Sequence, residues 1–277
     1  MKLYETSWFW GLVGATVILI VFGVFTAVGW PGEPDDCVTD PNGNCYCEAY
    51  VSPAVDPRGV KQPSNTWSGL APILAGVIIL YWGDQLRFRR TVGNNPMAEG
   101  TFYSIFYGAL VIFLGPGSMF FHGSLTRWGG FVDNFSMVLY IGFLIQYNLW
   151  RIFKWDSSKA VFAIVYAVAI IALAIPSYLV DGAGLIIFIV LVVGEILFEG
   201  AIMIWKPGGV DRRGGWGWLV AALATFGVSA VIWWLSWTNG PWCDPNSALQ
   251  GHIFWHILAM AATPFLVFLY LRQERRT

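Results

Sequence analysis

The sequence has little charge: Asp, Glu, Lys and Arg make up only 12% of its 277 residues, against about 25% in an ordinary soluble domain. Its 16 basic and 17 acidic residues leave a net charge of −1, so there is no excess positive charge for a polyanion such as nucleic acid. Its four cysteines are too few for a disulfide-dense secreted scaffold. These scarcities exclude a water-soluble globular domain, a nucleic-acid-binding protein and a small disulfide scaffold.

Long apolar runs take up most of the sequence, of which 56% is hydrophobic. A helix needs about 20 apolar residues to cross the ~30 Å hydrocarbon core of a membrane. Runs of this kind, bounded by Gly, Pro or charge, cover residues 8–30, 66–83, 99–121, 131–150, 160–180, 183–205, 216–238 and 249–271. They lack the alternation of barrel strands, and only helices and closed barrels satisfy their backbone groups in lipid. The sequence therefore predicts an all-α polytopic membrane protein, a single integral membrane domain over residues 1–277.

The first apolar run exceeds the roughly 7–15 residues typical of a cleaved signal peptide, and Glu5 dilutes the positive charge before it. We interpret it as a retained helix. Thirteen of the 16 basic residues then fall on the side of the two termini, and only Arg58, Lys61 and Arg127 fall on the other. The excess of Lys and Arg in cytoplasmic loops predicts that both termini are cytoplasmic. The exterior loops lack any Asn-x-Ser/Thr site, which favours a bacterial inner membrane over the ER or Golgi.

All four cysteines lie in predicted exterior loops, with Cys37, Cys45 and Cys47 in the segment 31–65 and Cys243 in the last loop. Disulfides form on this oxidising side of a membrane. Four cysteines allow three pairings, and the residues alone do not choose among them.

The only three histidines, His122, His252 and His256, lie near the exterior ends of predicted helices. Ser118 precedes His122 by one helical turn, and the two later histidines repeat the same spacing, so each pair shares a helix face. Asp133 opens the fourth predicted helix, also at its exterior end. The topology, deduced without reference to histidine, thus brings these five residues to one membrane depth.

Polar groups inside a bilayer are costly and mark functional sites. Three neutral imidazoles suit a catalytic zinc site, in which the fourth position is left for water, and Asp133 is then a candidate proton acceptor or orienting partner. A lone membrane histidine is more often a helix–helix hydrogen-bonding residue, and a His-x-x-x-His pair recurs by chance. The complete set of five residues favours metal binding over that alternative.

Three segments together resemble the alkaline ceramidase family: Ser118-Met-Phe-Phe-His122, Asp133-Asn-Phe-Ser-Met137 and Gly251-His252-Ile-Phe-Trp255-His256. This family belongs to a superfamily of seven-helix membrane hydrolases that includes the adiponectin receptors and the Per1-type lipid-remodelling proteins. The pair Cys47-Glu48 and the segment Gln62-Pro-Ser-Asn-Thr-Trp-Ser68 resemble the family's approach to its first core helix.

The resemblance spans residues 45–271 and implies a seven-helix core, to which residues 1–30 add one N-terminal transmembrane helix. It implies that His122, His252 and His256 hold one catalytic zinc ion. It also implies hydrolysis of the amide of ceramide or a related N-acyl membrane lipid to a fatty acid and a sphingoid base. Asp133 and Ser118 would flank the attacking water, with Asp133 taking its proton and Ser118 donating to the developing oxyanion.

The same resemblance, at Cys47-Glu48 and in the last exterior loop, leads us to predict a disulfide between Cys47 and Cys243, with Cys37–Cys45 as the second. Its support for calcium is weaker. Animal alkaline ceramidases bind calcium through an acidic cluster around the Cys-Glu pair, and this sequence departs from that pattern at Cys45, Tyr50 and Gln62, keeping only Glu48. Other oxygens lie nearby in Asp35, Asp36 and the segment Asp40-Pro-Asn42-Gly-Asn44, but that segment lacks the bidentate Glu at the twelfth position of a calcium loop.

Several other functions fit parts of the sequence. The same zinc chemistry would cleave esters in a lipid-remodelling enzyme, and a seven-helix lipid receptor would use zinc structurally. A retinal protein is excluded because none of the five lysines lies inside a predicted helix to form a Schiff base. Glu195 and Glu199 in the sixth helix would suit a proton-coupled transporter, but that leaves the histidines unexplained. We interpret the two glutamates as hydrogen-bonded to a neighbouring helix, with no catalytic role, and no obligate protein partner is evident.

Overall fold

The computed structural model describes residues 2–39, 45–88, 96–97, 101–153, 158–180, 182–205, 210–211, 215–271 and 274–275. Almost all secondary structure in these residues is helical, which confirms the all-α prediction. In chain order the helices are η1 (Leu3–Glu5), α1 (Ser7–Val28), α2 (Asp36–Thr39), α3 (Pro63–Ser68), α4 (Leu70–Phe88), α5 (Phe102–Ser124), α6 (Arg127–Phe153), α7 (Lys159–Leu179), α8 (Ala183–Trp205), α9 (Gly215–Leu235) and α10 (Gly251–Leu271). The strands β1 (Val210–Asp211) and β2 (Glu274–Arg275) form a short antiparallel pair.

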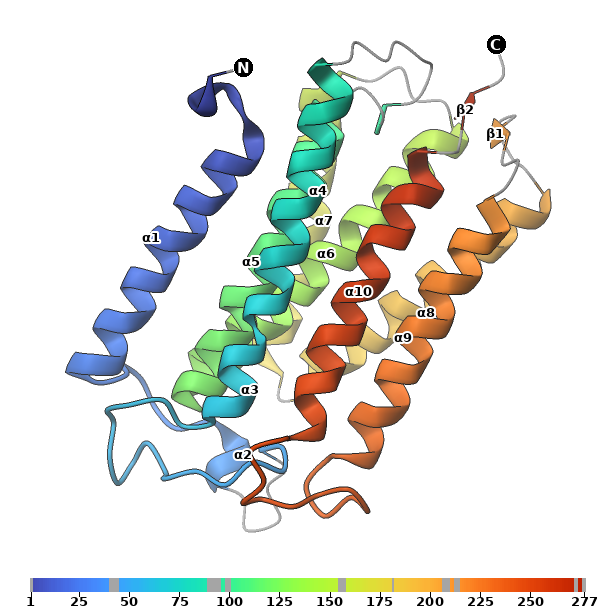
Figure 1. Cartoon of the computed structure of the whole chain (residues 1–277). Helices are drawn as coiled ribbons and strands as arrows, with labels where there is room; N and C mark the ends of the chain where they lie inside the picture. The colour runs from blue at the N-terminus through green and yellow to red at the C-terminus, as the bar shows by residue number, and fades with distance from the viewer. Residues whose placement is uncertain are drawn as a thin grey trace.

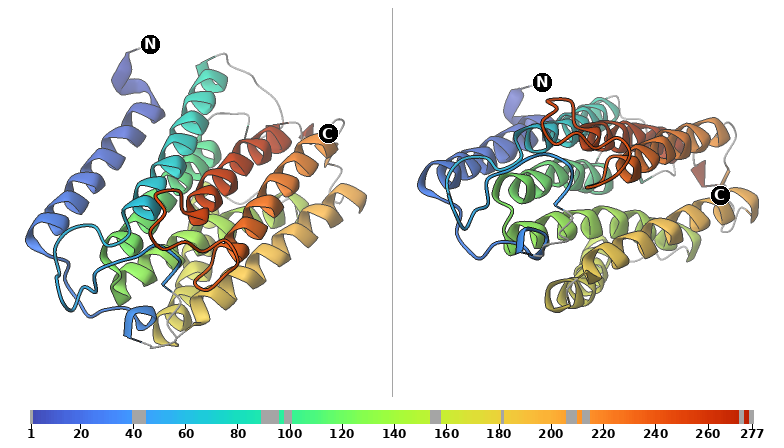
Figure 2. Two further views of the ribbon diagram at one scale, coloured as in Figure 1. Left: turned by 60° about the horizontal axis from the view of Figure 1, so that its bottom comes forward. Right: turned by 90° about the horizontal axis from the view of Figure 1, so that it is seen from below.

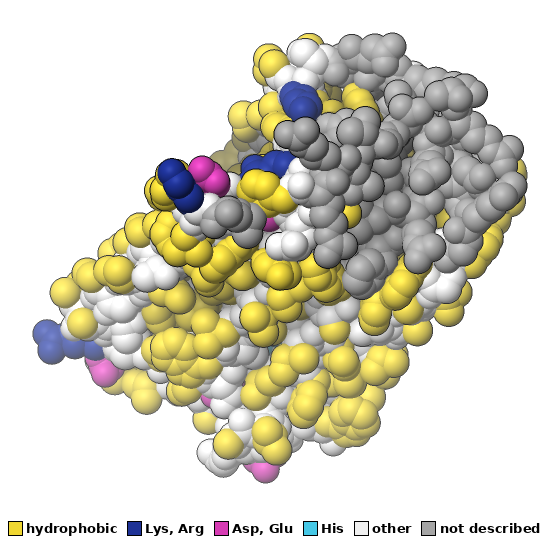
Figure 3. Space-filling view, turned by 45° about the horizontal axis from the view of Figure 1, so that its top comes forward, with side chains coloured by type: hydrophobic (Ala, Val, Ile, Leu, Met, Phe, Trp, Pro, Cys, Tyr) yellow, Lys and Arg dark blue, Asp and Glu magenta, His cyan; other side chains and the backbone are white. Residues whose placement is uncertain are grey.

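Seven helical segments in the described part of the chain are long and apolar enough to cross a membrane, and they match the first seven predicted runs. The eighth, α10, is apolar over Gly251–Val267 and continues as helix to Leu271. Large hydrophobic side chains are exposed on the outer helix faces, for example Ile164 at 62% and Leu197 at 67%. Such side chains cover much of the face shown in Figure 3. The protein is therefore an integral membrane protein.

The helices run side by side along one direction (Figure 1), and α1 begins at the same end of the bundle at which α10 ends. The opposite end holds α2, α3 and the longest described connections. Helix α5 lies at the centre, packed against α4 and α6, and nearly all of its residues after Gly108 are buried. Helix α1 packs on α4 and α5 at one edge, and α7 packs on α6 and α8 at another (Figure 2). The core thus centres on α5, which carries Ser118 and His122.

A close approach of two backbones brings α3 and α4 against α5. A Cβ atom added to Gly115 would lie 2.4 Å from the carbonyl oxygen of Gly69, so both positions require the absence of a side chain. Gly69 also separates α3 from α4, where the sequence predicts a single helix over 66–83. Because Gly115 lies one turn before Ser118, this contact packs α3 next to the end of α5 that carries Ser118 and His122.

Helix α6 begins at Arg127, earlier than the predicted start at residue 131. Thr126 acts as its N-cap, because the hydroxyl of Thr126 accepts a hydrogen bond from the backbone N–H of Gly129 at 3.4 Å. Gly129 and Gly130 look like a helix boundary in the sequence, but they lie inside the first turn of α6. Asp133 is therefore about two turns inside α6 and not at its start.

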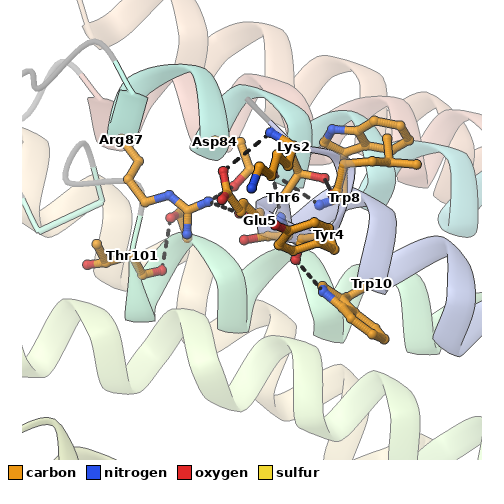
Figure 4. Close-up of polar contacts among 12 residues, drawn as sticks. Lys2, Tyr4, Glu5, Thr6, Trp8, Trp10, Asp84, Arg87 and Thr101 are labelled. Atoms are coloured by element: carbon orange, nitrogen blue, oxygen red, sulfur yellow. Dashed lines mark hydrogen bonds and ion pairs between the residues drawn. The ribbon is translucent and has the colours of Figure 1, made fainter.

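Helix α1 is fastened to α4 by a buried carboxylate (Figure 4). The side chain of Asp84, only 1% exposed, accepts hydrogen bonds from the backbone N–H groups of Ser7 at 2.6 Å and Trp8 at 3.1 Å. Its other oxygen pairs with Arg87 at 2.9 Å, and Arg87 donates to the carbonyl of Glu5 at 2.6 Å. Asp84 thus satisfies backbone donors at the start of α1, where a helix has no internal partners for them.

Both predicted disulfides are present. Cys37 is bonded to Cys45 and Cys47 to Cys243. The second bond joins the loop that follows α1 to the loop that precedes α10. Tyr46 therefore lies between two disulfide-bonded residues, Cys45 and Cys47.

Some residues used in the sequence predictions lie outside the described residues. These are Asp40, Asn42 and Asn44 of the calcium-like segment, and the basic residues Arg89, Arg90, Lys154, Lys206, Arg212, Arg213, Arg272 and Arg276.

Candidate metal centre

The three histidines meet at the end of the bundle that holds α2 and α3. His122 comes from the last turn of α5, and His252 and His256 come from the first two turns of α10. Each offers a ring nitrogen, and these nitrogens all lie within 4.8 Å of one another. All three side chains are buried. The structure therefore brings together all three residues that the sequence predicts as metal ligands.

Hydrogen bonding fixes the tautomer of His122. The side-chain nitrogen of Gln62 donates to the carbonyl oxygens of Cys45 and Glu48, which identifies the other amide atom as the oxygen. This oxygen lies 2.8 Å from Nδ1 of His122, so Nδ1 carries the proton and donates it. The Nε2 atom of His122 consequently has a free lone pair, and it faces Nε2 of His252 at 3.1 Å.

A similar argument fixes His256. The hydroxyl of Ser68 donates to the carbonyl oxygen of Asn65 at 2.6 Å, so it accepts from Nδ1 of His256, which also lies at 2.6 Å. The Nε2 atom of His256 therefore carries a lone pair and accepts a hydrogen bond from Ser118 at 3.1 Å. Two of the three histidines thus donate from Nδ1 to a protein acceptor and leave Nε2 unprotonated, as a metal ligand must be.

This arrangement could hold a metal ion such as zinc. Tetrahedral zinc with bonds of about 2.0–2.1 Å holds adjacent nitrogens about 3.3 Å apart, close to the 3.1 Å between the Nε2 atoms of His122 and His252. Two nitrogen atoms that meet at this distance need a cation or a proton between them to offset their repulsion. Within the described residues, this is the one group of three or more His, Cys, Asp or Glu side chains that meets the geometric requirements of a metal site.

A cavity of about 470 Å³ opens beside the histidines, and Ser118, Asp133, His252 and His256 all line it. Ser118 contacts His256 directly, while Asp133 reaches the same cavity from α6. The remaining lining is mostly apolar and comes mainly from α6, α8, α9 and α10, including Phe188, Val192, Leu223 and Leu266. The two predicted catalytic residues and two of the predicted metal ligands therefore share one largely apolar space inside the bundle.

The sequence did not identify the residues that position the site. Gln62 entered as a departure from a calcium pattern and, like Ser68, as part of a segment that resembles the family. Glu48 accepts from the backbone N–H groups of Ser64 at 2.7 Å and Asn65 at 2.9 Å, and so caps α3. The Gln62-Pro63 pair could have indicated in the sequence that a helix starts here, since Pro is favoured in the first turn of a helix.

Tyr46 was also missed. Its ring centroid lies 4.1 Å from that of His252 and 4.9 Å from that of His122. Burial raises the pKa of the Tyr46 hydroxyl above its usual range, and the negative charge of Asp133 raises it further. Tyr46 therefore stays protonated beside the histidines.

Glu195 and Glu199 are buried and joined to a neighbouring helix, as predicted. Asn148 of α6 donates from its side-chain nitrogen to Oε1 of both glutamates at 2.8 Å, and the hydroxyl of Tyr270 donates to Oε1 of Glu195 at 3.4 Å. Both glutamates also line the cavity. Asn148 lies 15 residues after Asp133 on α6, which corresponds to about 22 Å along the helix, so the cavity extends far from the histidines.

The fold and the site together define an integral membrane protein with a candidate metal centre at one end of an intramembrane cavity. The family model Ceramidase matches residues 60–276, and the chain belongs to this family. Membership implies a hydrolase that acts on amide bonds in a lipid such as ceramide. A search of curated proteins finds no match. The matched region includes all five predicted site residues and leaves out α1 and the Cys47-Glu48 pair.

Proposed function

We propose that the protein is a zinc-dependent intramembrane amidase that hydrolyses ceramide or a related N-acyl lipid to a fatty acid and a sphingoid base. The observation that carries the proposal is the buried trio His122, His252 and His256, in which the Nε2 lone pair of His122 faces Nε2 of His252, beside a largely apolar cavity. An apolar cavity of this size suits a lipid chain. The Ceramidase match supports the amide of a ceramide-like lipid over an ester as the bond that is cleaved.

In this proposal His122, His252 and His256 hold the metal. When bound, zinc supplies a Lewis acid that polarises the amide carbonyl and lowers the pKa of a water molecule to about 7. Asp133 accepts the proton of the attacking water and returns it to the leaving amine. The hydroxyl of Ser118 donates a hydrogen bond to the oxygen on which negative charge develops. The cavity keeps the acyl chain out of water while its amide lies beside these groups.

Product analysis combined with metal analysis tests this function. Purified protein incubated with ceramide should release equimolar fatty acid and sphingoid base, and it should contain one zinc per chain. His122→Ala and His256→Ala should lose both the metal and the activity, because two histidines cannot complete the site. Wild-type protein prepared without chelator that contains less than about a tenth of a zinc per chain would contradict the proposal, since structural and catalytic zinc sites bind tightly.

We further propose that the chain forms one integral membrane domain whose termini are cytoplasmic and whose metal centre faces the exterior, in a bacterial inner membrane. The distribution of Lys and Arg supports this orientation. The return of α10 to the end at which α1 begins is consistent with it (Figure 1).

A further inference from the structure

Tyr46 covers the candidate metal centre from the side of the exterior loops, and the proposed mechanism does not use it. Its ring lies against His252 and His122, with ring centroids 4.1 Å and 4.9 Å away. On another side it stacks on Trp237 with an interplanar angle of 17°. Tyr46 is half-buried and lines the cavity together with Ser118 and Asp133.

The backbone of Tyr46 is held in an unusual conformation. Its φ of 57° lies in the left-handed region, which residues with a side chain rarely adopt. The neighbours on both sides are disulfide-bonded, Cys45 to Cys37 and Cys47 to Cys243. Unfavourable backbone conformations persist where the surrounding structure enforces them, and they are concentrated at functional sites. The two disulfides hold this one aromatic ring over the histidines.

The hydroxyl of Tyr46 is placed to act as a donor. Trp233 lines the same cavity beside Tyr46, and its indole N–H can only donate to that hydroxyl, because Trp has no acceptor to offer in return. The hydroxyl proton of Tyr46 is therefore available to an acceptor in the cavity that both residues line.

The shape of the cavity indicates which part of a lipid lies near Tyr46. The apolar lining runs inward from the histidines along α8, past Phe188 and Val192. An acyl chain therefore extends into the bundle, and the polar head group stays at the loop end, where Tyr46, Trp233 and Trp237 are found.

We propose that Tyr46 is a substrate-binding residue whose hydroxyl donates a hydrogen bond to an oxygen of the lipid head group while the amide lies at the three histidines. The inference deepens the proposed function and rests on it for the identity of the lipid. Ser118 and Asp133 act at the amide, whereas Tyr46 acts on the part of the substrate that does not react. Binding energy of this kind is the same in the ground state and the transition state, so its loss changes KM and leaves kcat unaltered.

The test compares Tyr46→Phe, which removes only the hydroxyl, with the matched control Tyr50→Phe, an exposed tyrosine four residues later in the same loop. Tyr46→Phe should keep its zinc and raise KM for ceramide about tenfold, the effect of one neutral hydrogen bond, with kcat within about twofold of wild type. Tyr50→Phe should match the wild type in all three measurements. Loss of zinc in Tyr46→Phe, an unchanged KM, or a fall in kcat at constant KM would each overturn the proposal.

A binding measurement separates this inference from the proposed function. The purified wild type and Tyr46→Phe are titrated with a sphingoid base, which carries the head-group hydroxyls, and with a fatty acid, which lacks them. The variant should bind the sphingoid base about tenfold more weakly and the fatty acid equally well. This comparison holds even if the wild type fails to cleave ceramide, which would refute only the amidase. Equal binding of the sphingoid base to both proteins would refute the role of Tyr46.

Discussion

At the residue scale, Gln62 connects the loop that follows α1 to the candidate metal centre. One side chain donates to the carbonyl oxygens of Cys45 and Glu48 and accepts from Nδ1 of His122. The last contact fixes the ring orientation and the tautomer of a metal ligand, as hydrogen-bond partners of metal-binding histidines usually do. Gln62 is fully buried, so each of these three contacts would be left without water to replace it if the side chain were removed.

Gln62→Leu should therefore weaken zinc binding by about 10–100-fold, the usual cost of losing an orienting partner of a metal ligand. Competition against a zinc chelator of known affinity measures this. Gln250→Leu is the matched control, because Gln250 likewise donates to two loop carbonyls, those of Asp244 and Ser247, but does not hydrogen-bond to a histidine. Equal zinc affinity in the two variants would show that the contact of Gln62 with His122 is unimportant.

Asp133→Asn should retain zinc but reduce turnover by at least ~10²-fold, because an amide cannot accept the proton of the attacking water. Turnover and zinc content are measured on the same preparation. Asp56→Asn, which alters an exposed carboxylate in the loop after α1, should behave as wild type. Full activity in zinc-loaded Asp133→Asn would instead favour a lipid receptor with a structural zinc ion.

At the scale of elements, the disulfide between Cys47 and Cys243 ties the loop that carries Tyr46 to the start of α10, which carries two of the histidines. The two cysteines are 196 residues apart. Because a cross-link restricts the unfolded chain more when it closes a longer loop, this bond is expected to contribute more to stability than Cys37–Cys45, whose separation is only 8 residues.

Removing Cys47 and Cys243 together, as the double Ala variant, should lower the free energy of unfolding by about 2–5 kcal/mol. The double Ala variant at Cys37 and Cys45 should lose less. Denaturant unfolding in detergent, followed by Trp fluorescence, measures both. A larger loss for the short-loop pair would contradict the chain-entropy argument.

The sequence predicts the helices well because each transmembrane run has to be long and apolar. It misplaces the start of α6, since the N-cap Thr126 is followed by glycines that imitate a boundary. The candidate ligands are also predictable, because the chain has only three histidines and all fall at one depth. The positioning residues are not, because the partner of His256 is Ser68, 188 residues away. Such a contact follows from packing and leaves no local pattern.

At the scale of the whole molecule, the loop that follows α1 is joined to the candidate metal centre by hydrogen bonds of Glu48 and Gln62. Both carboxylate oxygens of Glu48 accept backbone N–H groups of α3, and the amide of Gln62 holds the Cys45 and Glu48 carbonyls. Both carboxylate oxygens of Glu48, the one acidic residue of the calcium pattern that the sequence keeps, are thus already hydrogen-bonded within the protein. We therefore expect activity to depend on zinc and not on calcium.

A calcium-selective chelator should accordingly leave activity unchanged, whereas a zinc-selective chelator should abolish it and added zinc should restore it. Turnover of ceramide after dialysis against each chelator measures the difference. Loss of activity on calcium removal, reversed by calcium alone, would refute this expectation.

The separation of Cys47 from Cys243 also has a consequence for biogenesis. In the proposed orientation, Cys37 and Cys45 can pair as soon as the loop after α1 has been translocated, but Cys47 can pair with Cys243 only after the loop before α10 has crossed the membrane. Until then Cys47 is expected to stay a free thiol next to the Cys37–Cys45 disulfide. Because Tyr46 lies between the two bonds, the cover over the histidines is completed only once the preceding helices have been inserted. The oxidation state of Cys47 is thus a chemical record of whether a given molecule has finished its assembly in the membrane.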